Sequence, residues 1–180
     1  MPSDKRIMEH STAQFFATLD STFSDLAAAA RVPVRAGRTS SVSQQGLFVA
    51  ATGALESAKE DGGRNVGLLH ISSPNGRSLV TAEGAEVRPG SYVLHVRDDG
   101  QVALRDGGGH TSVTAAPAEV DHERNDGGGI FYCGTGGYQF EVQYSHCQIC
   151  VSLICPGVWE YLLICFSIPF CDIATGWFGE

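Results

Sequence analysis

The sequence predicts an α+β fold in which two N-terminal helices pack on an antiparallel β-meander, followed by an apolar, cysteine-rich C-terminal segment. Apolar residues recur at three- and four-residue spacing before residue 60, which indicates helices. Short apolar runs separated by turn residues follow from Val66, and these indicate strands. All six cysteines lie after residue 129. A chain of 180 residues is long enough for one such domain with an appendage.

The first helix is expected over residues 12–30. Ser11 followed by Gln14 fits a capping box, in which the two side chains bond backbone N–H groups at the start of a helix. One face of the segment carries Phe15, Phe16, Leu19, Phe23, Leu26, Ala27 and Ala30. Pro33 and Gly37 then end the helix, because neither residue continues it readily.

A second helix is expected over residues 42–60. Its apolar side would carry Leu47, Phe48, Ala51, Leu55 and Ala58. Gly46 and Gly53 weaken the helix, and the pair at 62–63 ends it. The two helices would pack on the strands that follow, which is a layered α+β arrangement.

Four β runs follow the second helix: VGLLHI, RSLVTA, SYVLHVR and QVALR. The last two flank Asp99 and Gly100, and this pair is a strong hairpin signal because both residues accept positive φ. Alternation along the third run would place Tyr92 and Leu94 on one side of the sheet and His95 on the other.

Residues 41–105 resemble the second half of a roadblock/dynein light-chain domain, because a helical pattern precedes VGLLHISSPNGRSLVTAEGAEVRPGSYVLHVRDDG. In that family a long helix precedes a three-stranded meander, and the domains dimerise and act as scaffolds or as regulators of small GTPases. The resemblance implies a dimeric interaction module. The stretch VRPGSYVLHV is also similar to the Pro-Gly-X-Tyr strand entry of transthyretin-like β-sandwich modules, which have about seven strands.

The composition changes abruptly along the chain. We expect an α+β domain over residues 1–124, a Gly-rich linker over 125–129 and a Cys/aromatic-rich segment over 130–180. All twelve basic residues precede the last segment, which holds the six cysteines. Alternatively, the last segment is the Cys-rich product of a precursor, or a tail from a shifted reading frame or a retained intron without a functional site.

The net charge of −8 argues against nucleic-acid binding, because proteins that bind phosphate backbones use clustered Lys and Arg. The stretch MPSDKRIMEHSTAQFF lacks the apolar run of a secretory signal. We therefore expect a cytoplasmic protein, whose cysteines are thiols or metal ligands rather than structural disulfides.

The candidate metal ligands are Cys133, Cys147, Cys150 and Cys155. Cys147 and Cys150 have the CxxC spacing of zinc sites, and His146 is adjacent. A zinc ribbon has two such pairs, whereas this chain has one. We favour the alternative that the cysteines are small buried apolar residues. A redox role is weaker still, because no Lys or Arg lies nearby in the sequence to lower a thiol pKa.

A zinc-dependent hydrolase or nuclease is the rival hypothesis, with zinc held by the same cysteines. The stretch EVDHERND resembles the Asp-His core of His-metal finger nucleases. By that resemblance His122 would be the general base, and Asp121 or Asp126 would bind a divalent cation. A charged, solvated loop explains the same residues, and no basic residue follows Arg124 to bind phosphate.

Residues 149–170 carry one charge, Glu160, and have about the length that spans a bilayer. A charge near the middle of such a span is unfavourable, and Pro156 and Gly157 would break a helix there. A membrane tail anchor through these residues is therefore an alternative rather than the main prediction.

The main prediction is an acidic, non-enzymatic protein-interaction or scaffold module that binds protein partners and forms a homodimer or a larger homo-oligomer. Exposed apolar faces on a small chain must be buried by something, and self-association buries them. The sequence assigns no catalytic residue and no cofactor. Zinc on the four cysteines is the alternative cofactor.

Overall fold

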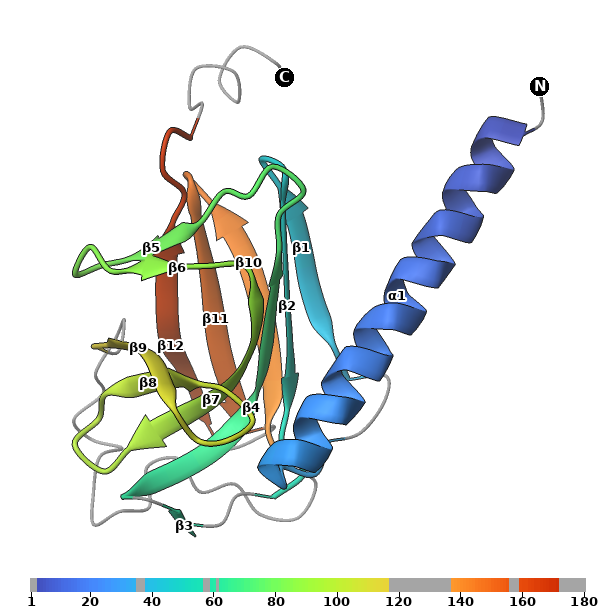
Figure 1. Ribbon diagram of the computed structural model, residues 1–180. Helices are drawn as coiled ribbons and strands as arrows, with labels where there is room; N and C mark the ends of the chain where they lie inside the picture. The colour runs from blue at the N-terminus through green and yellow to red at the C-terminus, as the bar shows by residue number, and fades with distance from the viewer. Residues whose placement is uncertain are drawn as a thin grey trace.

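The computed structural model is mostly β, with two antiparallel sheets and one helix (Figure 1). The structure describes residues 3–34, 38–56, 59–60, 62–116, 137–155 and 159–171. The helix, α1 (Ser3–Ala30), lies beside the larger sheet, and its N-terminal half projects away from both sheets (Figure 1).

The larger sheet has seven strands in the order β1-β2-β4-β7-β8-β9, with β3 paired to β4. These strands are β1 (Ser40–Gln44), β2 (Leu47–Gly53), β3 (Lys59–Glu60), β4 (Gly63–Ser72), β7 (Gly90–Arg97), β8 (Val102–Arg105) and β9 (Thr111–Ala115). The smaller sheet has five strands in the order β10-β11-β12-β5-β6. These are β5 (Leu79–Thr81), β6 (Glu86–Val87), β10 (Gln139–Ser145), β11 (Gln148–Cys155) and β12 (Trp159–Ser167).

The predicted fold class, two helices packed on a meander, is wrong. The described residues contain one helix, and residues 42–60, expected as the second helix, contribute to β1, β2 and β3. Val49, Ala50 and Ala51 of β2 are all fully buried, so this strand is covered on both faces. A strand buried on both faces lacks the two-residue alternation of polar and apolar positions, and the spacing of its apolar residues is then compatible with a helix.

A two-residue turn at Gln45 and Gly46 joins β1 to β2. Their φ angles are 56° and 74°, the left-handed pair that a type I′ hairpin turn requires. Glycine reaches this conformation at no steric cost. Gly46, which only weakened the predicted helix, is therefore one of the residues that make this segment a hairpin.

The first predicted helix is confirmed and is longer than expected, because α1 begins at Ser3 rather than at residue 12. Ser11 and Gln14 consequently lie inside the helix and do not cap its start. The preceding residues include Lys, Arg, Met and Glu, which are good helix formers.

Aromatic and aliphatic side chains attach α1 to the larger sheet. Phe23 is 3% exposed and meets the ring of His70 on β4 edge-on, with ring centroids 6.3 Å apart. Phe16 makes a similar contact with Phe48 of β2 at 5.9 Å, and Leu19 is 3% exposed. Burying one Leu or Phe side chain stabilises a fold by roughly 1.5–3 kcal/mol, so these contacts hold the C-terminal half of the helix.

The two sheets share one hydrophobic core, in which Leu94 of the larger sheet clusters with Phe140 and Phe166 of the smaller sheet. Residues from before and after the predicted linker thus contribute to the same core. The linker itself, residues 125–129, lies outside the described residues. The division into separate domains at that point stays a prediction.

Two glycines allow β10 to lie close to the larger sheet. A Cβ on Gly67 of β4 would overlap the ring of Phe140, and a Cβ on Gly53 of β2 would overlap the carbonyl of Tyr138. The Tyr138 N–H also donates to the Ala54 carbonyl at 2.9 Å. The close approach therefore requires glycine at both positions.

Other strand predictions are confirmed individually, although their arrangement differs. VGLLHI, SYVLHVR and QVALR lie in β4, β7 and β8, and the hairpin at Asp99 and Gly100 joins the last two. RSLVTA contains β5, but this strand belongs to the smaller sheet and interrupts the expected meander. The roadblock resemblance therefore fails as a fold. The stretch that suggested a sandwich module leads into β7, and the two-sheet arrangement is nearer to that alternative.

Candidate functional site

Three of the four predicted metal ligands are disulfide bonded. Cys147 is bonded to Cys171, Cys150 is bonded to Cys165, and Cys155 is bonded as well. Cysteine binds metal as the thiolate, so these sulfurs could hold zinc only after the disulfides are reduced.

The remaining residues of the predicted zinc and nuclease sites, Cys133, Asp121, His122 and Asp126, lie outside the described residues. Within the part of the chain that the structure describes, no three His, Cys, Asp or Glu side chains are placed to hold a metal ion. The zinc site and the nuclease both stay predictions.

The CxxC spacing belongs to a β-hairpin in this structure. His146 and Cys147 have φ angles of 51° and 64°, which fit a type I′ turn between β10 and β11. Cys150 lies on β11 directly opposite Cys165 on β12, with Cα atoms 4.1 Å apart. Such a short separation is typical of non-hydrogen-bonded pairs, where opposed side chains come closest. The two neighbours of Cys150 on β11 are fully buried, so this disulfide lies on the outward side of the sheet.

Disulfides of this kind are typical of proteins that fold in an oxidising compartment. The cytoplasmic location, inferred from the N-terminal stretch, stays a prediction. Cysteines opposed on two neighbouring strands could have been suspected from the sequence only if β11 and β12 had been predicted with their register.

His70 and Ser91 form a polar pair on neighbouring strands beneath α1, with His70 Nδ1 2.7 Å from Ser91 Oγ. Burial lowers the pKa of His70, because the charged imidazolium loses hydration there. A nucleophile and base pair would need a third group to orient the histidine, and no described carboxylate contacts His70. We therefore interpret the pair as packing between α1 and the sheet.

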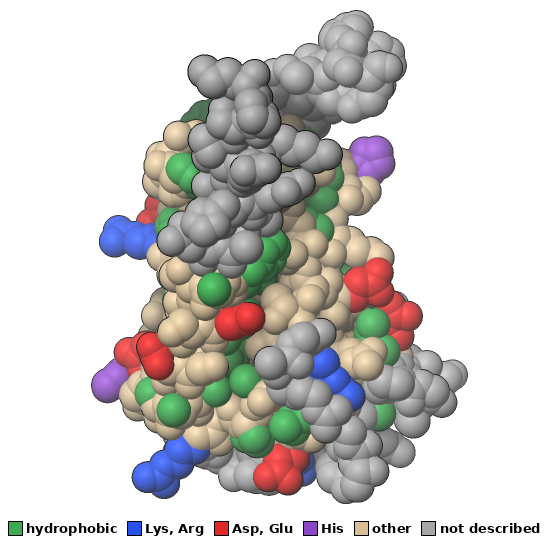
Figure 2. Space-filling view, turned by 90° about the vertical axis from the view of Figure 1, so that its right-hand side faces the viewer, with side chains coloured by type: hydrophobic (Ala, Val, Ile, Leu, Met, Phe, Trp, Pro, Cys, Tyr) green, Lys and Arg blue, Asp and Glu red, His purple; other side chains and the backbone are tan. Residues whose placement is uncertain are grey.

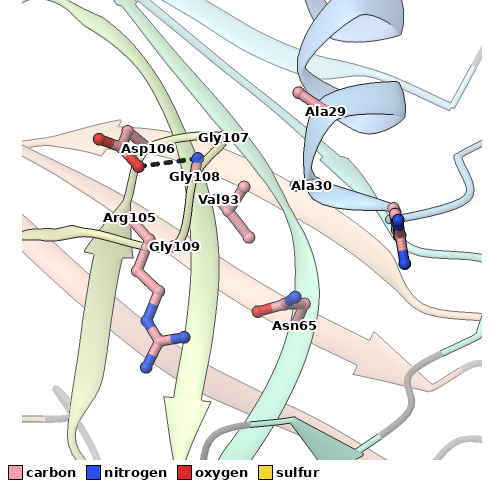
Figure 3. A pocket seen from close by; sticks show the side chains of 10 residues that line it. Ala29, Ala30, Asn65, Val93, Arg105, Asp106, Gly107, Gly108 and Gly109 are labelled. Atoms are coloured by element: carbon pink, nitrogen blue, oxygen red, sulfur yellow. Dashed lines mark hydrogen bonds between the residues drawn. The ribbon is translucent and has the colours of Figure 1, made fainter.

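His95 of β7 is fully buried, and its Nδ1 lies 2.7 Å from Oδ1 of Asn65 on β4. Asn65 in turn lines a pocket of about 460 Å³ between the C-terminal end of α1 and the loop that joins β8 to β9. Figure 3 shows Arg105 and Asn65 on one side of this pocket, with Ala29 and the glycine loop across from them. The volume is within the range of small-molecule sites.

The lining of the pocket comes from four elements and one loop. It consists of Ala29, Ala30 and Arg31 at the end of α1, Asn65 on β4, Val93 on β7, Arg105 on β8, and the loop residues Asp106, Gly107, Gly108 and Gly109. None of these residues was predicted as functional. Arginines 26 and 74 positions apart, on a helix and a strand, give no local motif that could have indicated the site.

Asp106 organises the loop beside the pocket. Its Oδ1 accepts backbone N–H groups from Gly108 at 2.9 Å and from His110 at 3.0 Å, and its Oδ2 lies 3.4 Å from His110 Nδ1. The hydrogen bond from the His110 backbone, followed by that from Gly108 and the charge of His110, lowers the pKa of Asp106. The carboxylate therefore stays ionised and is used within the loop.

Arg31 ends α1 in the left-handed conformation, with φ of 58°. Its N–H donates to the Ala28 carbonyl at 3.4 Å, and the Val32 N–H donates to the Ala27 carbonyl at 2.9 Å, which is the Schellman pattern. Glycine is the usual residue at this position, and another residue there costs roughly 1–2 kcal/mol. Residues strained in this way are concentrated at functional sites. Here the strained residue is an arginine that lines the pocket.

Two further observations limit the surface. Among the described residues, no helix has the length and apolar character needed to cross a bilayer, and the described parts of residues 149–170 form mainly β11 and β12. Figure 2 shows the face on which α1 lies, where the Lys and Arg side chains are spread apart from one another rather than gathered into one patch.

Comparison with known proteins gives no match: no family model fits the chain, and no curated protein or solved structure matches it significantly. The functional argument therefore depends on the residues of this chain alone.

Proposed function

We propose that the chain is a non-enzymatic protein-interaction module that associates with a second copy of itself. The observation that carries this proposal is Phe170, a large apolar side chain that is 100% exposed. Single exposed apolar residues are common on protein surfaces. Phe170 differs from these because the backbone on both sides of it is held in place.

Three contacts hold the chain around this phenylalanine. They are the Ile168 N–H to the Cys147 carbonyl at 3.0 Å, the Arg77 guanidinium to the Pro169 carbonyl at 2.7 Å, and the disulfide between Cys171 and Cys147. Phe170 itself has φ of 56°, an unfavourable conformation for a residue with a side chain. A fixed aromatic side chain loses little conformational freedom on binding, which favours its use as an anchor.

The helix α1 offers a second apolar contact for a partner. Phe16 is 40% exposed although it touches Phe48, and the helix continues beyond Phe16 away from the sheets (Figure 1). In a symmetric dimer each copy supplies the same patch, so one exposed aromatic residue contributes twice. The net charge of −8 opposes association of two copies, and salt screens this repulsion.

Sedimentation velocity over a range of protein concentrations tests the proposal. We expect association that strengthens with concentration and with added salt. Phe170→Ser should raise the dissociation constant by about tenfold or more, because an anchor residue contributes at least ~1.4 kcal/mol. Asn75→Ser is the control, since Asn75 is exposed in the loop that also holds Arg77.

Two outcomes contradict the proposal. One is a wild-type chain that stays monomeric at every concentration. The other is a dissociation constant that Phe170→Ser and Asn75→Ser change equally. Phe16→Ser separates the two contacts, because it alters α1 and leaves the Phe170 connection intact.

A further inference from the structure

We propose that the pocket between α1 and the β8–β9 loop binds a small organic anion. Arg31 and Arg105 hold its charged end, and its short apolar part packs against Val93 and Ala30. The site shares no residue with the contacts around Phe170 and Phe16, so it does not depend on self-association.

The charge of the lining supports an anionic ligand. The pocket carries two guanidinium groups and one carboxylate, in a chain whose net charge is −8. The carboxylate of Asp106 is engaged by the N–H groups of Gly108 and His110. The pocket is thus a locally positive region on an acidic protein, and such a region attracts anions.

The type of cation specifies the ligand further. A guanidinium group is planar and presents paired N–H donors that match the two oxygens of a carboxylate or phosphate. Arg31 comes from the end of α1 and Arg105 from β8, so the two groups reach the pocket from different elements. Two such groups can hold one oxyanion between them.

The rest of the lining fits a short apolar group. Val93 is 2% exposed, and Ala30 adds a methyl group from the helix. The glycines of the loop leave space: Gly109 has φ of 87°, and a Cβ on Gly107 would lie 3.0 Å from the Cβ of Ala29. A volume of about 460 Å³ is ample for a carboxylate with a short alkyl chain.

Titration of the ¹⁵N-labelled chain with sodium butyrate, inorganic phosphate and the neutral isostere butyramide tests the site by nuclear magnetic resonance. We expect saturable shifts of the Gly107, Gly108 and Gly109 amide signals with butyrate. Phosphate should bind more weakly, because it lacks the apolar part, and butyramide should cause no saturable shift. Binding of butyramide as tightly as butyrate would overturn the anion assignment, and phosphate binding as tightly as butyrate would overturn the organic part.

Arg31→Gly and Arg105→Gln remove the two cations separately. Each should weaken butyrate binding by about tenfold or more, since each removes a charge-assisted hydrogen bond. Arg31→Gly is the sharper variant because glycine suits a φ of 58°, so the melting temperature should not fall. Arg88→Gln is the matched control: Arg88 is exposed and pairs with Glu86. Equal butyrate affinity in all three variants would overturn the proposal.

Discussion

β7 of the larger sheet is buried on both faces, whereas β11 of the smaller sheet is buried on one. Five consecutive residues of β7, from Tyr92 to Val96, have little or no exposure. In β11 the fully buried residues Ile149, Val151 and Leu153 alternate with partly exposed ones. The larger sheet has α1 against one face and the smaller sheet against the other, while the described outer face of the smaller sheet carries a disulfide instead.

The difference shows two ways to stabilise a sheet. A covering helix adds buried apolar area, and the larger sheet uses it without any cysteine. A disulfide adds no comparable area and acts mainly by restricting the unfolded chain. The smaller sheet also depends on the larger one, because Tyr138 and Phe140 pack beside Gly53 and Gly67.

Removal of the smaller sheet is expected to have the largest effect. A fragment of residues 1–129 lacks β10, β11 and β12, so its remaining core loses Phe140 and Phe166 and exposes Leu94. We expect no cooperative thermal transition by circular dichroism, whereas the full chain unfolds cooperatively. A fragment that melts cooperatively would instead support a separate domain over residues 1–124.

Loss of the disulfides should have the next largest effect. The bond between Cys150 and Cys165 closes a loop of 15 residues, and a loop of this length is worth about 3 kcal/mol in the unfolded chain. The bond between Cys147 and Cys171 spans 24 residues and should contribute similarly. Paired Cys→Ser variants for each bond, measured by urea unfolding, give the two values. Equal stability of the variants and the oxidised wild type would show that the smaller sheet does not need the bonds.

The sequence predicts the strands better than it predicts their arrangement. β4, β7, β8 and β10 have β-branched or alternating apolar residues and turn signals, so local pattern identifies them. β2 is buried on both faces, and its spacing imitates a helix. β5 pairs with β12, which lies far along the chain, and local sequence carries no signal for such a contact.

The candidate sites were less predictable still. The cysteines attracted attention through the spacing of Cys147 and Cys150, yet those two sulfurs belong to different disulfides. Arg31 and Arg105 line one pocket only because α1 ends beside the β8–β9 loop. Phe170 is exposed although its apolar segment suggested burial, because its neighbours are tied to the β10–β11 turn and to Arg77.

The contact between the sheets can be tested at one atom. Gly67→Ala places a methyl group where the ring of Phe140 lies, and overpacking of this kind costs about 1–3 kcal/mol. Gly107→Ala is a control outside this contact, since its Cβ would meet only side-chain atoms of α1 at 3.0 Å or more. Urea unfolding should show a clear loss for Gly67→Ala and a smaller one for Gly107→Ala. The reverse order would mean that the sheets are not in close contact at Gly67.

The smallest expected effect concerns His70, which lies between the larger sheet and α1. Burial lowers its pKa in the folded chain, so the unfolded chain binds the proton more readily. The contribution of neutral His70 to stability is therefore complete above the ordinary histidine pKa, near 6.5, and is lost as pH falls from there through the folded pKa. Because the ring is only partly buried, we expect less than about 1 kcal/mol.

Urea unfolding of the wild type and of His70→Gln between pH 5 and 8 measures this contribution. The stability difference between the two chains should shrink as the solution is acidified, because only the wild type loses the favourable burial of a neutral ring. His146→Asn is the control, since asparagine tolerates the left-handed turn position and the side chain is exposed. It should keep the wild-type pH profile. A difference between wild type and His70→Gln that does not change with pH would mean that α1 packs equally well on the charged ring, and the helix would then cover the larger sheet more loosely than the contact with Phe23 implies.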